Sequence, residues 1–210
     1  MTPLRGKFIV LDGGEGCGKS TQTKLLRERL EAEGLHVLAV RDPGTTRVGE
    51  LIRAILLNPD HGEMGFRCEM MLYMAARAQM MAEVIGPALD VGKVVVCDRF
   101  VSSTLAYQLG GDGLTAEEIR SVAQIALRGR WPDLTVLLDM PVERSSARVT
   151  RAKDRIEQRP IEYHAQVRRN YLAQAEAEPA RYRVVAADRD LEPVREDVWR
   201  AVASLGSVET

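Results

Sequence analysis

The chain has few features that would place it outside the reducing interior of a cell. Its 210 residues include only three cysteines, Cys17, Cys68 and Cys97, which lie far apart and without the spacing of a metal site. We therefore expect reduced, buried or half-buried thiols. Residues 1–6 lack the apolar segment of a signal peptide, and no apolar run reaches the ~20 residues that span a bilayer. These absences predict a cytoplasmic protein without a membrane partner.

The chain also lacks an excess of charge of either sign. Lys and Arg number 29 and Asp and Glu number 30, so the formal net charge is −1. Domains that bind nucleic acids usually carry a basic surface, so we expect no nucleic-acid partner, and any basic site must be local. There is no internal repeat and no low-complexity linker. A length of 210 residues suits a single α/β domain.

Short apolar runs alternate with longer helical patterns along the whole chain. The apolar runs predict strands at 8–11, 36–40, 93–97, 134–138 and 183–187. Helical periodicity predicts helices at 20–33, 48–57, 66–88 with a bend before Pro87, 116–127, 141–149, 162–176 and 192–203. This alternation predicts an α/β fold, a five-stranded parallel sheet with helices on both faces. Ligands of such sheets bind beyond the carboxyl ends of the strands.

A glycine-rich loop follows the first predicted strand. Residues 13–20 read Gly-Gly-Glu-Gly-Cys-Gly-Lys-Ser and fit the G-x-x-x-x-G-K-[ST] pattern of a P-loop. Its backbone N–H groups and the following helix N-terminus suit an anion, Lys19 can reach the β- and γ-phosphates, and Ser20 can bind Mg²⁺. A chance match in a chain of this length is on the order of 1%. The predicted ATP-binding residues are Gly13, Gly14, Glu15, Gly16, Cys17, Gly18, Lys19, Ser20 and Thr21.

The P-loop alone does not define the reaction, because GTPases, motor ATPases and small-molecule kinases share it. Asp98 and Arg99 end the third predicted strand, where a carboxylate suits Mg²⁺ and a guanidinium suits phosphate. The alternative is a salt bridge at the end of the strand. Residues 41–45, Arg-Asp-Pro-Gly-Thr, follow the second strand. They form either an ordinary Pro-Gly turn or a loop at the same sheet edge as the P-loop.

Two further segments have both a functional and a structural interpretation. Tyr73 and Arg77 share one helix face. The tyrosine ring could stack on a base, and the guanidinium could form hydrogen bonds with the edge of that base. Methionines along this helix favour a packed or dimer-forming helix instead; they are Met70, Met71, Met74, Met80 and Met81. Residues 148–159 form a dense basic segment. It is either a solvated loop or a lid that brings arginines to a transferring phosphoryl group.

Together these segments resemble thymidylate kinases of the bacterial form over nearly the whole chain. The most specific feature is an Asp-Arg-aromatic motif at residues 98–100, followed by Tyr107 eight residues after its arginine. The other segments that carry the resemblance are residues 13–21, Arg41-Asp42-Pro43-Gly44, Tyr73 with Ala75-Ala76-Arg77, Ser103-Thr104, Ala106-Tyr107-Gln108, Pro132-Asp133-Leu134 and Asp154-Arg155-Ile156-Glu157.

The resemblance implies a P-loop kinase of three layers with a short lid at about residues 148–160, and a homodimer. It implies transfer of the γ-phosphoryl group of ATP to dTMP, with Mg²⁺, to give dTDP and ADP on the route to dTTP. The implied metal ligands are Ser20 and Asp98. The implied catalytic residues are Lys19, Glu15, Arg99, Arg151 and Arg155. The implied acceptor-binding residues are Asp42, Tyr73, Arg77, Arg99, Ser103, Thr104, Tyr107 and Gln108.

Within this resemblance Tyr73 would stack on thymine, Arg77 would bond its carbonyl edge, and Tyr107 would lie under the sugar and disfavour a 2′-hydroxyl. The chain departs from the family pattern at Asp112, where an arginine is usual, and we expect this anion to affect substrate affinity. Two other functions stay open: a kinase for another nucleoside monophosphate, and a nucleotide-binding regulator without turnover. Retention of Lys19, Ser20, Asp98 and Arg99 argues against the regulator.

Overall fold

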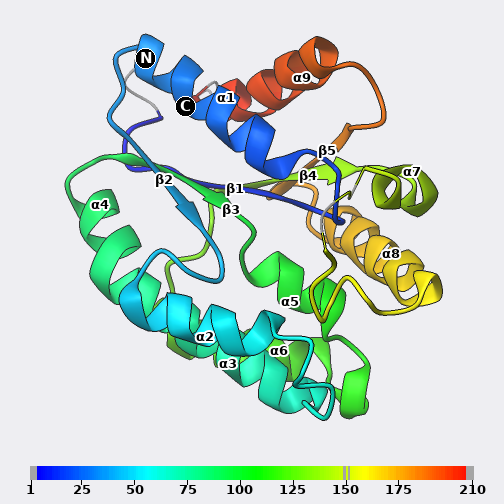
Figure 1. Ribbon diagram of the computed structural model, residues 1–210. Helices are drawn as coiled ribbons and strands as arrows, with labels where there is room; N and C mark the ends of the chain where they lie inside the picture. Colours follow the sequence, from blue (N-terminus) through cyan, green and yellow to red (C-terminus); the bar gives the residue numbers. More distant parts are fainter. Residues whose placement is uncertain (1–3, 149, 151, 207–210) are drawn as a thin grey trace.

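The computed structural model describes residues 4–148, 150 and 152–206 (Figure 1). Within these residues five parallel strands form one sheet in the order β2-β3-β1-β4-β5. The strands are β1 (Phe8–Gly13), β2 (Val37–Arg41), β3 (Val94–Asp98), β4 (Leu134–Asp139) and β5 (Tyr182–Ala186). The predicted five-stranded parallel α/β fold is confirmed, and the strand that precedes the P-loop lies at its centre.

The helices largely follow the predicted pattern. They are α1 (Lys19–Ala32), α2 (Arg47–Leu57), α3 (Phe66–Met80), α4 (Gly86–Asp90), α5 (Val101–Tyr107), α6 (Ala116–Leu127), α7 (Val142–Ser146), α8 (Ile161–Ala177) and α9 (Leu191–Ala203). Helix α5 was not predicted, because all its residues are buried and it shows no polar face. The helix predicted at 141–149 ends at Ser146, and Val149 lies outside the described residues.

The bend predicted before Pro87 takes the form of a π-helical segment. It spans Met81–Ile85 and joins α3 to α4. Pro87 has no N–H to donate to the preceding turn, and the N–H of Gly86 reaches back to Met81 O. A wider π-helical turn therefore stands where a regular α-helical hydrogen bond is lost.

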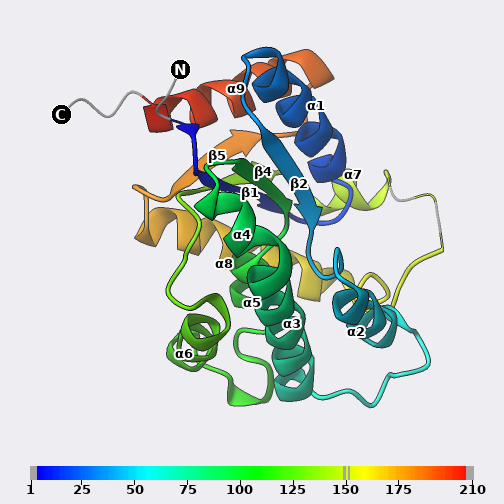
Figure 2. The same cartoon turned by 90° about the vertical axis from the view of Figure 1, so that its left-hand side faces the viewer.

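Helices cover both faces of the sheet, as Figures 1 and 2 show: α1 and α9 lie on one face, and α3, α4, α5 and α8 on the other. The alternation of side chains along β1 connects the two layers. Ile9 and Leu11 pack into the core cluster that contains α1 and α9. Phe8 and Val10 pack into the opposite cluster, with residues of α3 and α6.

The carboxyl ends of the central strands bring the predicted motifs together. In register, Asp98 of β3 lies opposite both Leu11 of β1 and Arg41 of β2. The N–H of Arg99 donates to Leu11 O at 3.0 Å, and the N–H of Asp42 donates to Asp98 O at 3.0 Å. The P-loop, the Asp98-Arg99 pair and the loop after β2 therefore share one edge of the sheet. None of the helices in the described ranges is long and apolar enough to cross a membrane.

Candidate active site

The P-loop backbone closes around the Lys19 ammonium group. Lys19 begins α1, and its Nζ donates to Gly14 O at 2.6 Å and to Gly13 O at 3.2 Å. Gly13 has a φ of 143°, and a Cβ there would lie 2.4 Å from Leu138 O of β4. Only glycine fits at this position. The cradle expected from the sequence therefore forms, with its cation held beneath it.

Ser20 and Asp98, the two predicted metal ligands, lie side by side. Ser20 Oγ donates to Asp98 Oδ2 at 2.6 Å, and both line the cleft that opens over the P-loop with Lys19 and Thr21. Hydroxyl and carboxylate oxygens are ligands that Mg²⁺ accepts beside phosphate oxygens and water. The donor set therefore fits the predicted ion.

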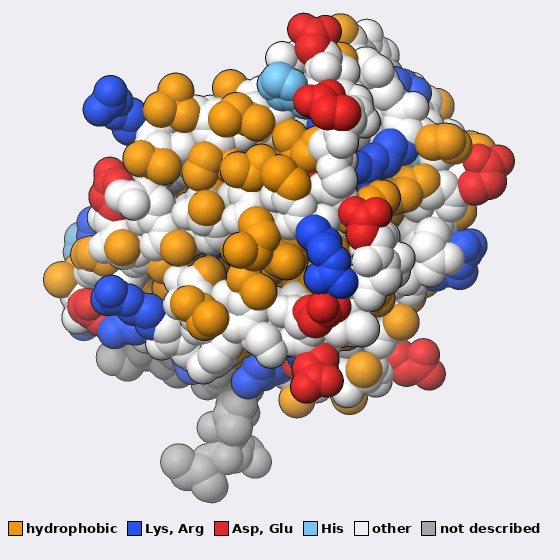
Figure 3. Space-filling model, turned by 90° about the horizontal axis from the view of Figure 1, so that it is seen from below, with side chains coloured by type: hydrophobic (Ala, Val, Ile, Leu, Met, Phe, Trp, Pro, Cys, Tyr) orange, Lys and Arg blue, Asp and Glu red, His pale blue; other side chains and the backbone are white. Residues whose placement is uncertain are grey.

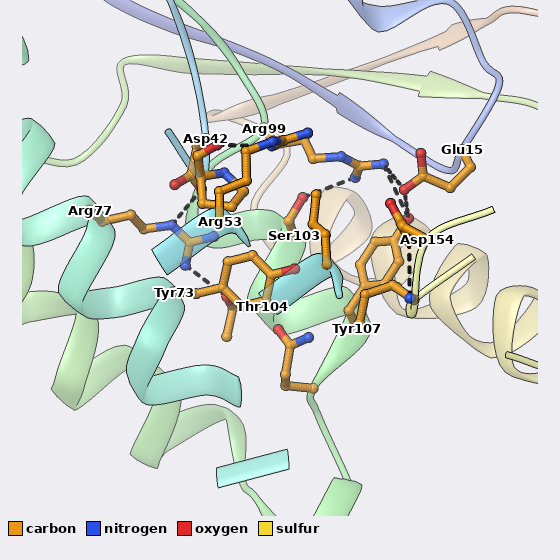
Figure 4. Close-up of a pocket in the computed structure, with 14 residues that line it drawn as sticks. Glu15, Asp42, Arg53, Tyr73, Arg77, Arg99, Ser103, Thr104, Tyr107 and Asp154 are labelled. Carbon is orange, nitrogen blue, oxygen red and sulfur yellow. Dashed lines mark hydrogen bonds and ion pairs between the residues drawn. The ribbon is translucent and has the colours of Figure 1, made fainter. Parts of the chain in front are cut away.

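Arg99 extends from the end of β3 toward the P-loop. Its φ of 69° lies in the left-handed region, uncommon outside glycine. The guanidinium donates to Gly13 O at 3.0 Å and to Tyr107 Oη at 3.3 Å, and it bonds the Glu15 carboxylate (Figure 4). Burial is the largest single effect and opposes the charged form, but the electrostatic interactions with Glu15, Tyr107, Tyr171 and Asp12 together outweigh it, so the pKa of Arg99 lies well above its ordinary value.

Asp12 supports this arrangement, although the sequence analysis did not single it out. It is fully buried at the end of β1 and accepts hydrogen bonds from Ser103 Oγ at 2.8 Å and Tyr171 Oη at 2.6 Å. Its Oδ1 lies 3.4 Å from Arg99 Nη1. A buried carboxylate with several donors holds a neighbouring cation in one place. The sequence does carry a signal for Asp12, because it is an acid that lies directly after an apolar run and before the P-loop.

A second cavity opens beside Arg99, and Figure 4 shows its lining side chains converging from several elements. Every predicted acceptor-binding residue lines it: Asp42, Tyr73, Arg77, Arg99, Ser103, Thr104, Tyr107 and Gln108. Arg53 of α2 and Asp154 also line the cavity, and neither is among the residues predicted from the sequence. Arg53 was hidden within the helical pattern of 48–57, where a single arginine looks like an ordinary surface residue.

Arg77 is a fixed part of the cavity wall. It is fully buried; Nε donates to Asp42 Oδ2 at 2.7 Å, Nη1 to Thr104 Oγ1 at 2.7 Å, and Nη2 to Phe100 O at 2.8 Å. Nη1 also contacts Met74 Sδ at 3.6 Å. Of its five N–H groups, one on Nη2 is left for a base edge. Burial raises the pKa of Asp42 even though Arg77 opposes this shift.

The arginines of the predicted lid occupy different positions, and two of them, Arg151 and Arg155, are predicted to be catalytic. Arg148 is exposed and lines the cleft over the P-loop. Arg155 is 8% exposed, bonds the Glu69 carboxylate, and donates from Nε to Leu56 O at 2.9 Å. In this structure Arg155 does not line the phosphate cleft, and its catalytic role stays a prediction. Arg151 lies outside the described residues.

Asp112 does not line the acceptor cavity. Its Oδ2 accepts a hydrogen bond from Phe66 N at 2.7 Å, at the start of α3. A carboxylate there satisfies a free N–H of the first helical turn and suits the positive end of the helix. The departure from the family pattern therefore has a structural role, and the structure gives no support for the expected effect on affinity.

The two clefts meet along one shared wall. Glu15, Asp42, Arg53 and Arg99 line both of them. Phosphoryl transfer between two nucleotides requires this arrangement, because the donor phosphate and the acceptor must approach in line. The fold and the paired clefts define a P-loop nucleoside monophosphate kinase.

Comparison with known proteins narrows this class. The family model described as thymidylate kinase matches residues 11–198. The chain is 49% identical to the thymidylate kinase of Pelotomaculum thermopropionicum over 201 residues, 94% of this chain and 93% of that protein. It is 46% identical to the thymidylate kinase of Neisseria meningitidis serogroup B, over 95% of this chain and 97% of that protein. The chain belongs to the thymidylate kinase family.

Proposed function

We propose that this chain transfers the γ-phosphoryl group of ATP to dTMP, giving dTDP and ADP on the route to dTTP. The position of Arg99 carries the proposal, together with membership of the family. Its guanidinium contacts Gly13 O of the P-loop and Tyr107 Oη of the acceptor cavity, at 3.0 and 3.3 Å. An acceptor phosphate bound there lies beside the phosphates of the donor.

The P-loop and Arg99 provide most of the positioning. Lys19 and the loop N–H groups bind the β- and γ-phosphates, where they neutralise charge that spreads over the transferring group. A phosphate dianion replaces the Glu15 carboxylate on Arg99, because a guanidinium binds phosphate oxygens in pairs. Glu15 then lies beside the acceptor sugar.

Mg²⁺, when bound, neutralises the β- and γ-phosphates of ATP. Ser20 and Asp98 would hold it, because the Ser20 oxygen keeps a lone pair free while its proton goes to Asp98 at 2.6 Å. Both side chains are thus already oriented toward the phosphate cleft.

We also propose a single kinase domain whose lid spans about residues 148–160. Arg148, at its upstream end, faces the phosphate cleft. Asp154 lines the acceptor cavity, and its Oδ1 accepts from Ile156 N at 3.0 Å and Glu157 N at 2.9 Å. The segment thereby borders both substrates. Cytoplasmic location remains a prediction.

We propose a homodimer in which a second copy covers α2 and α3. Figure 3 shows hydrophobic side chains gathered on the face of the molecule that carries these helices. Val48, Leu51 and Ile55 lie on α2 at helical spacing and are 45%, 61% and 43% exposed. On α3, Met71 is 55% exposed, whereas the other methionines of the predicted methionine-rich face are buried in the core: Met70, Met74, Met80 and Met81.

The dimer is tested by sedimentation of Leu51→Glu and of a matched control, Leu191→Glu. Leu191 is 48% exposed but begins α9, on the opposite side of the sheet. We expect a monomer for the first variant and a dimer for the second. A dimer in both variants would place the interface elsewhere. A monomeric wild-type protein would contradict the proposed dimer.

The function is tested by measuring ADP release with each nucleoside monophosphate in turn. We expect the highest kcat/KM with dTMP and dependence on Mg²⁺. A higher value with another monophosphate would identify a kinase for that acceptor. No ADP release with any of them, in a protein that binds ATP, would identify a nucleotide-binding regulator.

A further inference from the structure

Glu69 connects the acceptor cavity with the segment that precedes α8. It lies on α3, is fully buried, and its Oε1 accepts a hydrogen bond from Gln108 Nε2 at 2.7 Å. Its Oε2 accepts from Arg159 Nη2 at 2.8 Å and from Arg155 Nη2. Gln108 lines the acceptor cavity. One carboxylate therefore holds a cavity residue and two arginines from a distant part of the chain.

The charge of Glu69 determines which end of the Gln108 amide faces it. Both oxygens of this carboxylate accept hydrogen bonds, Oε2 from two guanidinium groups and Oε1 from Gln108, and a carboxylate has no proton to donate. The Nε2 group of Gln108 must therefore face Glu69, because the opposite orientation brings two oxygens together. The carbonyl oxygen Oε1 of Gln108 is then left for the cavity, as an acceptor.

We propose that Glu69 is a positioning residue that sets base specificity by orienting Gln108. An acceptor in the cavity wall suits a base that carries an N–H on its ring edge, as thymine and uracil do at N3. It disfavours cytosine, whose N3 is an unprotonated acceptor. The inference rests on the proposed function, because it assumes that the base of the acceptor nucleotide lies in this cavity.

The neutral variant Glu69→Gln separates this role from a structural one. Its amide can donate or accept, so Gln108 is free to turn and the cavity no longer presents only an acceptor. A matched control is Arg159→Met, which releases one lid arginine while Arg155 and Gln108 keep their bonds to Glu69. The measurement is kcat/KM for dTMP and for dCMP with each protein.

We expect Glu69→Gln to reduce the preference for dTMP over dCMP by roughly 10- to 100-fold, mainly through the KM for dTMP. The preference should stay unchanged in Arg159→Met. Gln108→Leu should lose the preference too, and adding Glu69→Gln to it should change the ratio no further. This non-additivity is expected only if Glu69 acts through Gln108.

Three results would overturn the inference. A folded Glu69→Gln protein that loses activity equally with both nucleotides shows that Glu69 only stabilises the structure. If Glu69→Gln does not fold, the Gln108→Leu variant tests the inference. A preference for dTMP that is retained in Gln108→Leu would show that the Gln108 amide does not recognise the base. A wild-type protein without preference for dTMP over dCMP contradicts the proposed function as well, whereas an unchanged ratio in Glu69→Gln contradicts the inference alone.

Discussion

The Ser20 hydroxyl donates a hydrogen bond to Asp98 Oδ2 across 2.6 Å, although 78 positions separate the two residues in the chain. Pairing of β1 with β3 creates this proximity, since it places the end of β3 beside the P-loop. The pair lies in the phosphate cleft with Lys19. The site is therefore tested directly by measuring how turnover depends on the Mg²⁺ concentration.

Ser20→Ala should raise the Mg²⁺ concentration needed for half-maximal turnover by roughly 10-fold or more, because a ligand and its orienting bond to Asp98 are both lost. ADP release over a range of Mg²⁺ concentrations measures this. Ser20→Thr is the matched control, since it keeps the hydroxyl and P-loops accept either residue. An unchanged Mg²⁺ requirement in Ser20→Ala would remove Ser20 from the metal site.

Lys19→Met should lower kcat by roughly 10²–10³-fold, because the cation that neutralises the transferring group is removed. Circular dichroism should show a folded protein, since the methionine stem fills the same space. Near-normal turnover in a folded variant would rule out the P-loop assignment.

The P-loop and the strands were predictable because their signals are local. An apolar run followed by a glycine-rich loop and a helix occupies one short stretch of sequence, and its geometry needs few distant contacts. Helix α5 was missed because its burial on all sides removes the polar face that reveals a helix. Its seven residues, buried polar side chains among them, are also too few to show a helical period in the sequence.

The position of Arg155 shows what the sequence does not contain. A basic segment has the same composition whether its arginines face solvent, a phosphate or a buried acid. The partner of Arg155 is Glu69, which lies 86 positions earlier in the chain and showed no local pattern of its own. Only the packing of α3 against the segment before α8 reveals the pair.

Arg155→Met should lower the free energy of unfolding by about 1–3 kcal/mol, because it leaves part of a buried carboxylate uncompensated while Arg159 remains. Arg148→Met should change that free energy by less than about 0.5 kcal/mol, since Arg148 is exposed. It should instead lower kcat, by about 10-fold, because Arg148 faces the phosphate cleft. Denaturant unfolding and steady-state kinetics on both variants test this. A large loss of kcat in Arg155→Met with kcat unchanged in Arg148→Met would support Arg155 as the catalytic arginine.

Tyr107→Ala should reduce the preference for dTMP over its ribo analogue by roughly 1–3 kcal/mol, because it removes from the cavity wall the ring that the family resemblance predicts to lie under the sugar. Tyr107→Phe should keep most of the preference. It should weaken dTMP binding, because the hydroxyl that bonds Arg99 at 3.3 Å and Glu15 Oε1 at 3.2 Å is lost. Both expectations are tested by measuring kcat/KM for dTMP and for its ribo analogue with each variant. An unchanged ratio in Tyr107→Ala means that the sugar is read elsewhere.

Burial raises the pKa of every tyrosine in the chain: Tyr73, Tyr107, Tyr163, Tyr171 and Tyr182. For Tyr163 the pKa rises to about 12. At about pH 11 the native protein should show little tyrosinate absorbance, whereas the denatured chain should be largely ionised, since free tyrosine has a pKa of about 10. Equal absorbance in the two states would contradict the burial of these rings.

The same shift predicts how stability depends on pH in alkaline solution. Between the unfolded and folded pKa values the native state binds more protons than the unfolded state. This contribution to stability is fully present below about pH 10, and it is lost as the pH rises through the folded values. Tyr163→Phe should remove the part of the loss that occurs near pH 12.

The wall shared by the two clefts, formed by Glu15, Asp42, Arg53 and Arg99, has a consequence for inhibition. A single compound with a thymidine-like head and an anionic chain could extend along this wall from one cleft into the other. Linking the two parts makes the second contact intramolecular, at an effective concentration on the order of millimolar. A resistance substitution at Arg99 would also disturb the position of the natural acceptor, so the routes by which a cell could escape such a compound at this wall are few.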